Sequence, residues 1–142
     1  MAITDVIMQA LANSGLVQYP DKKLYKAATL LTPEERPKRP VRVKDPKNFI
    51  GHGPTVVGFY DDVARNITIN KKSSEYRDPQ RLAATIAHEA EHERRAGQPD
   101  IDLEGPAYQR QLDVLQWLGF KNTVYMNALQ NELLNMLKME KK

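Results

Sequence analysis

Hydrophobic and polar positions alternate along this chain with two different periods, which divide it into predicted helices and strands. Apolar residues recur every three or four positions, as on one face of an α-helix, over residues 3–14, 21–31, 79–95, 104–118 and 123–138. Two shorter runs at 55–60 and 66–70 are rich in β-branched residues and flank a polar stretch, which is typical of a β-hairpin. The pattern therefore predicts an α+β fold that is mostly helical, with a short antiparallel sheet packed on the helix at 79–95.

Short capping signals mark where several of these elements begin and end. Asp78 and Pro79 suit the N-cap and the first position of the helix at 79–95, and Gly97 follows its basic last turn. Asn122 is placed to cap the last helix, and residues 32–35 (Thr-Pro-Glu-Glu) have the form of a capping box. These signals support the boundaries that the periodicity predicts.

The length of 142 residues fits a single domain over 1–142 with a core of its own. We expect N-terminal helices and a basic connector over 1–50, the hairpin and two site helices over 55–118, and a C-terminal helix over 122–138. The chain has no cysteine, which excludes disulfides and thiolate metal ligands. Any metal must therefore be held by histidine or carboxylate side chains.

The N-terminal region lacks the pattern of a secretory leader. Asp5 interrupts it early, Gln9 and Asn13 break its apolar run, and no cationic segment comes first. No apolar stretch approaches the ~20 residues of a membrane span, and the lack of cysteine fits a reducing compartment. We therefore expect a cytoplasmic protein without a membrane partner, and the pattern specifies no oligomeric state.

The helix at 79–95 carries the strongest chemical signal, the motif His88-Glu89-x-x-His92. Two histidines four residues apart lie on one helix face, one turn from each other. Both imidazoles can therefore reach one metal ion, while Glu89 projects beside it toward a metal-bound water. Zinc with two histidines, one further ligand and an open fourth position forms a hydrolytic site. The alternative is a charge-rich exposed helix, which the scarcity of aliphatic side chains on the histidine face argues against.

The third metal ligand has to come from elsewhere in the chain. The acidic turn after the motif and the helix that follows offer Glu104, Asp102 and Asp100. We favour Glu104, because it opens a helix that would point it back at the histidines if the two helices pack antiparallel. Asp102 is an alternative cap of that helix. All three acids would equally complement the dipole of the helix N-terminus.

Two side chains near the motif, Tyr108 and His52, have more than one interpretation. Tyr108 lies one turn beyond Glu104, so its hydroxyl could donate a hydrogen bond to a developing oxyanion; the alternative is a core aromatic with its hydroxyl at the surface. His52, in a glycine-rich turn, could be a third ligand or an oxyanion donor. The alternative, which we favour, is an exposed loop histidine. Trp117 is interpreted as a packing residue.

Residues 36–47 form a basic, proline-rich arm. Its cationic side chains are Arg36, Lys38, Arg39, Arg42, Lys44 and Lys47. Such an arm can bind nucleic acid or an acidic partner, but no aromatic is interleaved for base stacking. We therefore favour a solvated connector. Val41 and Val43 alternate with basic residues, which predicts a short edge strand within the arm.

The motif, followed by Glu104-x-x-Ala107-Tyr108 at the start of a second helix, resembles the zincin metallopeptidases. Within them the chain is most similar to the gluzincins, whose third ligand is a glutamate, and to their small members, the minigluzincins. The resemblance covers residues 55–118 and implies that the hairpin corresponds to the substrate-binding sheet of the family. It implies a catalytic base at Glu89 and zinc ligands at His88, His92 and Glu104.

Several departures set limits to this resemblance. The metzincin pattern requires Gly and His where Arg95 and Gln98 stand, and the SprT-like branch has a downstream histidine that this chain lacks. The spacing from His92 to Glu104 is shorter than in the large gluzincins, and a small intracellular branch that cleaves phage-type repressors is also similar in layout. The resemblance implies a zinc peptidase acting on a peptide or protein substrate. The alternatives are a catalytically silent metal-binding domain and a nucleic-acid-associated module.

Overall fold

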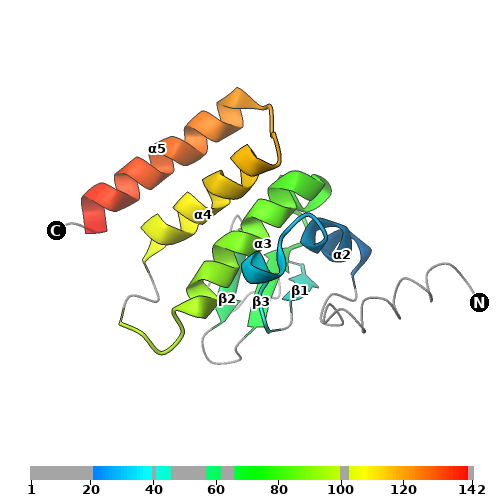
Figure 1. Ribbon diagram of the computed structural model, residues 1–142. Coiled ribbons are helices and arrows are strands. Elements are labelled where there is room, and N and C mark those ends of the chain that lie inside the picture. Colours follow the sequence, from blue (N-terminus) through cyan, green and yellow to red (C-terminus); the bar gives the residue numbers. More distant parts are fainter. Residues whose placement is uncertain (1–20, 40, 46–56, 62–65, 100–102, 141–142) are drawn as a thin grey trace, which may run out of the picture.

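The computed structural model describes residues 21–39, 41–45, 57–61, 66–99 and 103–140 (Figure 1). Its elements, in chain order, are α2 (Lys22–Ala28), a 3₁₀ turn η1 (Pro33–Glu35), β1 (Val41–Lys44), β2 (Gly58–Asp61), β3 (Asn66–Asn70), η3 (Ser74–Arg77), α3 (Pro79–Arg94), α4 (Glu104–Trp117) and α5 (Thr123–Glu140). This content confirms the predicted α+β class. The helix predicted over 3–14 lies outside the described residues.

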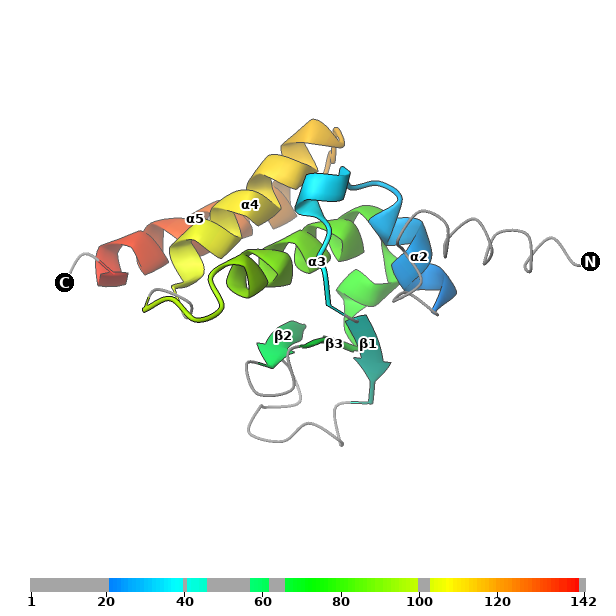
Figure 2. The same cartoon turned by 60° about the horizontal axis from the view of Figure 1, so that its bottom comes forward.

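Three long helices lie in succession, with α4 between α3 and α5 (Figure 1). The helices α3 and α4 run antiparallel, so the end of α3 and the start of α4 meet at the same end of the pair. Figure 2 shows the sheet on the side of α3 that faces away from α5. Helix α3 is therefore covered from two sides, which explains why it carries the largest share of the buried residues. None of the helices within the described ranges combines the length and apolarity that crossing a membrane requires.

The sheet has the strand order β1-β3-β2. The predicted hairpin is confirmed, because β2 pairs antiparallel with β3, with Phe59 opposite Thr68. The predicted edge strand is also present, but it adds a parallel pair, with Val41 opposite Ile67. The sheet is thus mixed rather than purely antiparallel. Pairing in this register aligns Val41, which is buried, with the buried Ile67 and extends the apolar face that packs toward the helices.

The hydrophobic core lies between the sheet and helices α2, α3 and α4, and Leu129 and Leu133 of α5 extend it. Its largest fully buried side chains are Leu24, Val41, Ile67, Ile69, Leu82, Ile86, Val114 and Leu115. Three alanines on the inward face of α3, at 83, 87 and 90, are almost completely buried. Small side chains let neighbouring elements approach closely, so α3 packs tightly on both sides.

The capping signals placed most helix boundaries correctly. The Asp78 carboxylate accepts hydrogen bonds from the backbone N–H groups of Gln80 at 3.0 Å and Arg81 at 3.3 Å, and Pro79 occupies the first turn of α3. The capping box at 32–35 is formed. After α3, Gly97 adopts a φ of 82°, the left-handed region that glycine tolerates.

Two expectations about the helices were wrong. The helix predicted over 21–31 ends at Ala28, whereas the last helix is present as predicted and extends to Glu140. Trp117 does not pack: it is 60% exposed. The reason is its angular position on α4, where Asp113 and Gln116 on the same outward side are also exposed. An apolar residue type alone did not reveal which face it occupies.

Candidate metal centre

One face of α3 buries the polar motif instead of exposing it. His88, Glu89 and His92 are 7%, 6% and 8% exposed. One possible ligand atom from each of the three lies within 4.8 Å of those of the other two. The two imidazoles are one helical turn apart, with ring centroids separated by 5.3 Å. This cluster can hold a metal ion, as the spacing of the motif predicts.

The start of α4 brings a carboxylate to both histidines. Glu104 Oε1 lies 2.6 Å from His92 Nε2, and Glu104 Oε2 lies 3.2 Å from His88 Nε2. The antiparallel packing of α3 and α4 produces this contact, because the first residue of α4 lies beside the last turns of α3. The three other acids and histidines considered from the sequence lie outside the described residues: His52, Asp100 and Asp102.

The charges of the cluster compensate one another. Burial raises the pKa of Glu89, and the two histidines offset this effect only in part. Burial acts in the same direction on Glu104, but hydrogen bonds from His88 and His92 outweigh it and lower the pKa of Glu104 to about 2. Burial lowers the pKa of His88, yet Glu89 and Glu104 raise it overall. The site therefore favours positive charge between the Glu104 carboxylate and the imidazoles.

The donor set suits a divalent transition metal. Two imidazole nitrogens each lie within 3.2 Å of a carboxylate oxygen of one glutamate, and zinc takes this combination in hydrolytic sites. Imidazole also suits other first-row divalent ions. The chemistry of the donors thus supports a metal centre, and the choice among metals follows from the reaction considered below.

Tyr108 packs beside the site. Its ring lies edge-on to His88, with ring centroids 4.8 Å apart, and it contacts the hydrophobic core. Burial, followed by the negative charge of Glu104, raises the pKa of Tyr108 to about 12. Its hydroxyl therefore keeps its proton at neutral pH and can donate a hydrogen bond. The ring has the packing role considered from the sequence, and the oxyanion role of its hydroxyl stays a prediction.

Gln111 belongs to the site and was missed in the sequence. Its Oε1 atom lies 2.8 Å from His88 Nδ1, and both side chains are buried. Gln111 follows Glu104 by seven residues, so two helical turns place both residues on the same face of α4. That spacing was a signal in the sequence, but it becomes meaningful only once α4 is known to pack on α3 through this face.

Strand β2 reaches the site from the other side of α3. The backbone N–H of Tyr60 donates a hydrogen bond to the Glu89 carboxylate, which partly counteracts the raised pKa. Gly58, at the start of β2, lies close to β3: a Cβ there would lie 3.0 Å from Ile69 Cδ1 and 3.1 Å from the Thr68 carbonyl oxygen. The hairpin therefore contributes a backbone donor to the motif.

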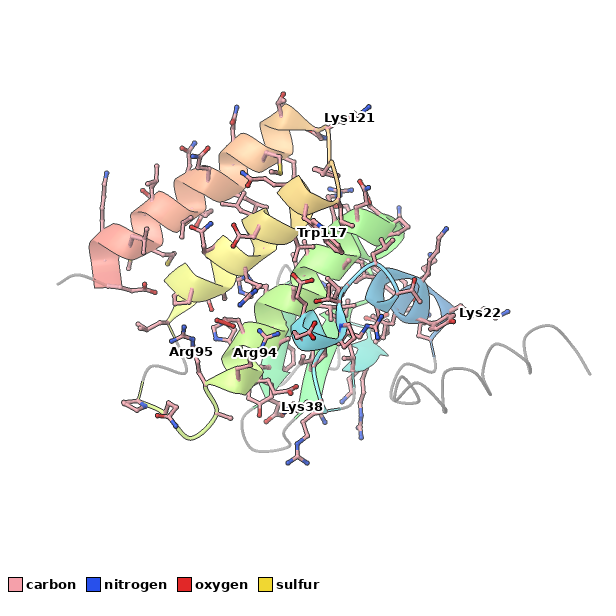
Figure 3. The ribbon with its side chains drawn as sticks, viewed as in Figure 1. Lys22, Lys38, Arg94, Arg95, Trp117 and Lys121 are labelled. Carbon is pink, nitrogen blue, oxygen red and sulfur yellow. The ribbon has the colours of Figure 1, made fainter. Side chains whose placement is uncertain are left out.

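The start of the basic arm, at Lys38 and Arg39, is attached to the end of α3 (Figure 3). The carboxylate of Glu93 accepts hydrogen bonds from the backbone N–H groups of Lys38 at 2.7 Å and Arg39 at 3.3 Å. Arg94 donates to the Glu34 carbonyl, and Arg36 donates to the Ala28 carbonyl at 3.0 Å. These contacts agree with a connector that is fastened to the motif helix. Binding of nucleic acid by the arm stays a prediction.

Comparison with known proteins adds no relative: no family model matches the chain, and no curated protein or solved structure matches it significantly. The interpretation of the site therefore depends on its own residues and geometry.

Proposed function

We propose that this protein is a zinc-dependent metallopeptidase that hydrolyses peptide bonds. The observation that carries the proposal is the convergence of His88, His92 and Glu104 beside a buried Glu89. Even when such buried polar groups compensate one another, they contribute little more stability than apolar side chains of the same volume would. A fold that collects all four in one place is therefore better explained by chemistry than by stability.

In this proposal His88, His92 and Glu104 hold zinc, and Glu89 remains beside it as a base. When bound, zinc would supply a Lewis acid that lowers the pKa of a water molecule and polarises the carbonyl of a peptide bond. The absence of cysteine agrees with an all nitrogen and oxygen ligand set. The same residues make a catalytically inert metal-binding domain the main alternative.

Glu89 is suited to move protons during hydrolysis. Its raised pKa brings the carboxyl group closer to neutral pH, where a general base accepts and returns a proton most effectively. We propose that Glu89 takes a proton from the attacking water and passes it to the leaving amine. The Tyr60 N–H orients the Glu89 carboxylate, and the Tyr108 hydroxyl donates to the oxyanion that develops on the carbonyl.

The position of β2 supports a peptide as the substrate. Among the strands of the described residues, β2 lies at one end of the strand order, and Tyr60 connects it to Glu89. Extended peptides bind along edge strands through main-chain hydrogen bonds. A peptide aligned with β2 would bring one of its carbonyl groups near the proposed base.

The test compares the full-length wild type with Glu89→Gln, using the exposed Glu34→Gln as the matched control. Zinc content and cleavage of a broad peptide library are measured on the same samples. We expect all three proteins to bind one zinc ion and only Glu89→Gln to lose cleavage. Stoichiometric zinc in a wild type that cleaves no peptide would favour the inert metal-binding domain. Unchanged turnover in Glu89→Gln would remove Glu89 from the mechanism.

A further inference from the structure

A buried amide connects α4 with the first histidine of the motif. Gln111 Oε1 lies 2.8 Å from His88 Nδ1, and the two side chains are 6% and 7% exposed. The Nε2 atom on the opposite side of the same ring faces Glu104 at 3.2 Å. The His88 ring is thus held between two groups of α4, one at each nitrogen.

The chemistry of the two nitrogens decides what this arrangement does. A neutral imidazole carries its proton on one nitrogen and offers a lone pair on the other. An amide oxygen only accepts hydrogen bonds, so Gln111 Oε1 favours the proton on Nδ1. Without metal, Nε2 also carries a proton toward Glu104; when a metal binds, Nε2 is the nitrogen that offers its lone pair. Metal-binding histidines commonly have such a partner on their second nitrogen.

A second contact fixes which end of the amide faces the histidine. The Gln111 side chain also forms a hydrogen bond with the hydroxyl of Tyr125, which lies on α5. Because the amide nitrogen can donate to this hydroxyl, the amide oxygen is left for His88. The chain of contacts runs from α5 through α4 to α3, so the orientation of His88 depends on the packing of all three helices.

We propose that Gln111 is a positioning residue, which keeps a proton on Nδ1 of His88, so that Nε2 is the nitrogen that binds the metal. The inference relies on the metal site of the proposed function and adds a residue that neither the motif nor its resemblance assigns. A neutral acceptor orients the ring without adding a third carboxylate to a site that already contains Glu89 and Glu104. Gln111 itself does not touch the metal or the substrate.

Three variants of the full-length protein test this role. Gln111→Met keeps much of the volume but removes the acceptor, and Gln111→Glu retains an acceptor oxygen. Gln116→Met is the matched control, because Gln116 is exposed on the same helix. The affinity for Zn²⁺ is measured by competition with a chelator, and the absorption spectrum of bound Co²⁺ reports the ligand geometry.

We expect Gln111→Met to bind Zn²⁺ about 10- to 100-fold more weakly, the usual effect of losing such a partner. Its Co²⁺ spectrum should change as well. Gln111→Glu should recover most of the affinity, and Gln116→Met should behave as the wild type. A folded Gln111→Met with wild-type affinity and an unchanged Co²⁺ spectrum would overturn the inference.

The contact with Gln111 can also be read without metal, from long-range proton–nitrogen NMR spectra of the His88 ring. The wild type should carry a proton on Nδ1, donated to Gln111, beside the proton on Nε2 that faces Glu104. An Nδ1 without a proton in the wild type would refute the role of Gln111 even if Gln111→Met failed to fold. If the wild type carries the Nδ1 proton but binds no zinc, the proposed function fails and the orienting contact stands.

Discussion

Two faces of the same helix, α3, are buried for opposite reasons. On the core face, Leu82 and Ile86 are completely buried among apolar neighbours from the sheet and helices. On the site face, His88, Glu89 and His92 are nearly as well buried, but they are polar and ionisable. The two faces are buried to a similar degree, but burial is favourable on the core face and unfavourable on the site face unless partners compensate it.

The core face of α3 stabilises the fold, whereas the site face depends on that stability. Removing apolar side chains from water is favourable, by about 25 cal/mol for each Å². Removing a carboxylate or an imidazolium from water is unfavourable unless partners compensate it. Glu104, Gln111 and the Tyr60 N–H provide this compensation on the site face. The core face thus makes the helix stable enough to hold the site face in place.

The change Glu89→Gln should distinguish the site face from the core face most clearly, because it should lower activity without lowering stability. General acid–base groups contribute about 10²- to 10⁴-fold to rates, so hydrolysis should fall by that factor. Because burial raises the pKa of Glu89, its ionised form is unfavourable in the folded state, and the metal-free variant should be as stable as the wild type or more stable at neutral pH. Urea denaturation beside an activity assay checks both. A marked loss of stability would show that Glu89 behaves as a core residue.

The opposite change is made on the core face, with Ile86→Ala. Deleting a buried Ile side chain to Ala typically costs about 2–5 kcal/mol, because it loses apolar burial and leaves a cavity. We expect this loss in denaturant unfolding, and about 0.5–1.5 kcal/mol for the milder Ile86→Val. Zinc bound per folded chain should not change in either variant. Loss of zinc binding in folded Ile86→Val would mean that the two faces are not separable.

A smaller effect is expected at the N-terminus of α3, away from the motif. Asp78 caps two backbone N–H groups there, and removing such a cap costs about 1 kcal/mol. Asp78→Ala should lower the free energy of unfolding by that amount, whereas Asp78→Asn, which keeps an acceptor oxygen, should lose less. Both variants should bind zinc as the wild type does. Equal losses in the two variants would argue against the capping role.

Acid should weaken the ion pairs between Glu104 of α4 and the two histidines of α3 in the metal-free protein. Folding lowers the pKa of Glu104 from 4.5 to about 2, so its stabilising contribution is complete above pH 4.5 and is lost as the pH falls toward 2. The effect is modest, because 36% of the Glu104 side chain is exposed to screening water. The difference in unfolding free energy between the wild type and Glu104→Gln should therefore shrink over this range. A difference that does not depend on pH would contradict the ion pairs.

Much of this arrangement could be predicted from local sequence, because local physics determines it. Asp78 and Pro79 mark a helix start by their backbone chemistry, and the histidine spacing follows from the helical repeat. Glu104 was predicted because it opens the next helix, and antiparallel packing of neighbouring helices supplied the rest. What remained hidden depends on distant packing: the contact of Gln111 with His88 requires the crossing of α4 on α3.

The pairing of β1 and the exposure of Trp117 also depend on distant packing. A four-residue strand such as β1 carries too little information to specify its partner, so its parallel pairing with β3 was not predicted. Trp117 was expected to pack because it is large and apolar, yet its place on α4 turns it outward. Residue type predicts what a side chain can do, and the packing of the elements decides whether it does it.

The metal centre is tested most directly by the binding of zinc to the purified full-length protein. The wild type is compared with His92→Ala and with Gln116→Met, a control in which an exposed residue of α4 is changed. We expect one tightly bound zinc ion per chain in the wild type and in Gln116→Met. We expect none in His92→Ala, with circular dichroism showing that all three remain folded. A folded wild type that binds no zinc, or His92→Ala that binds it as tightly as the wild type, would contradict the metal centre.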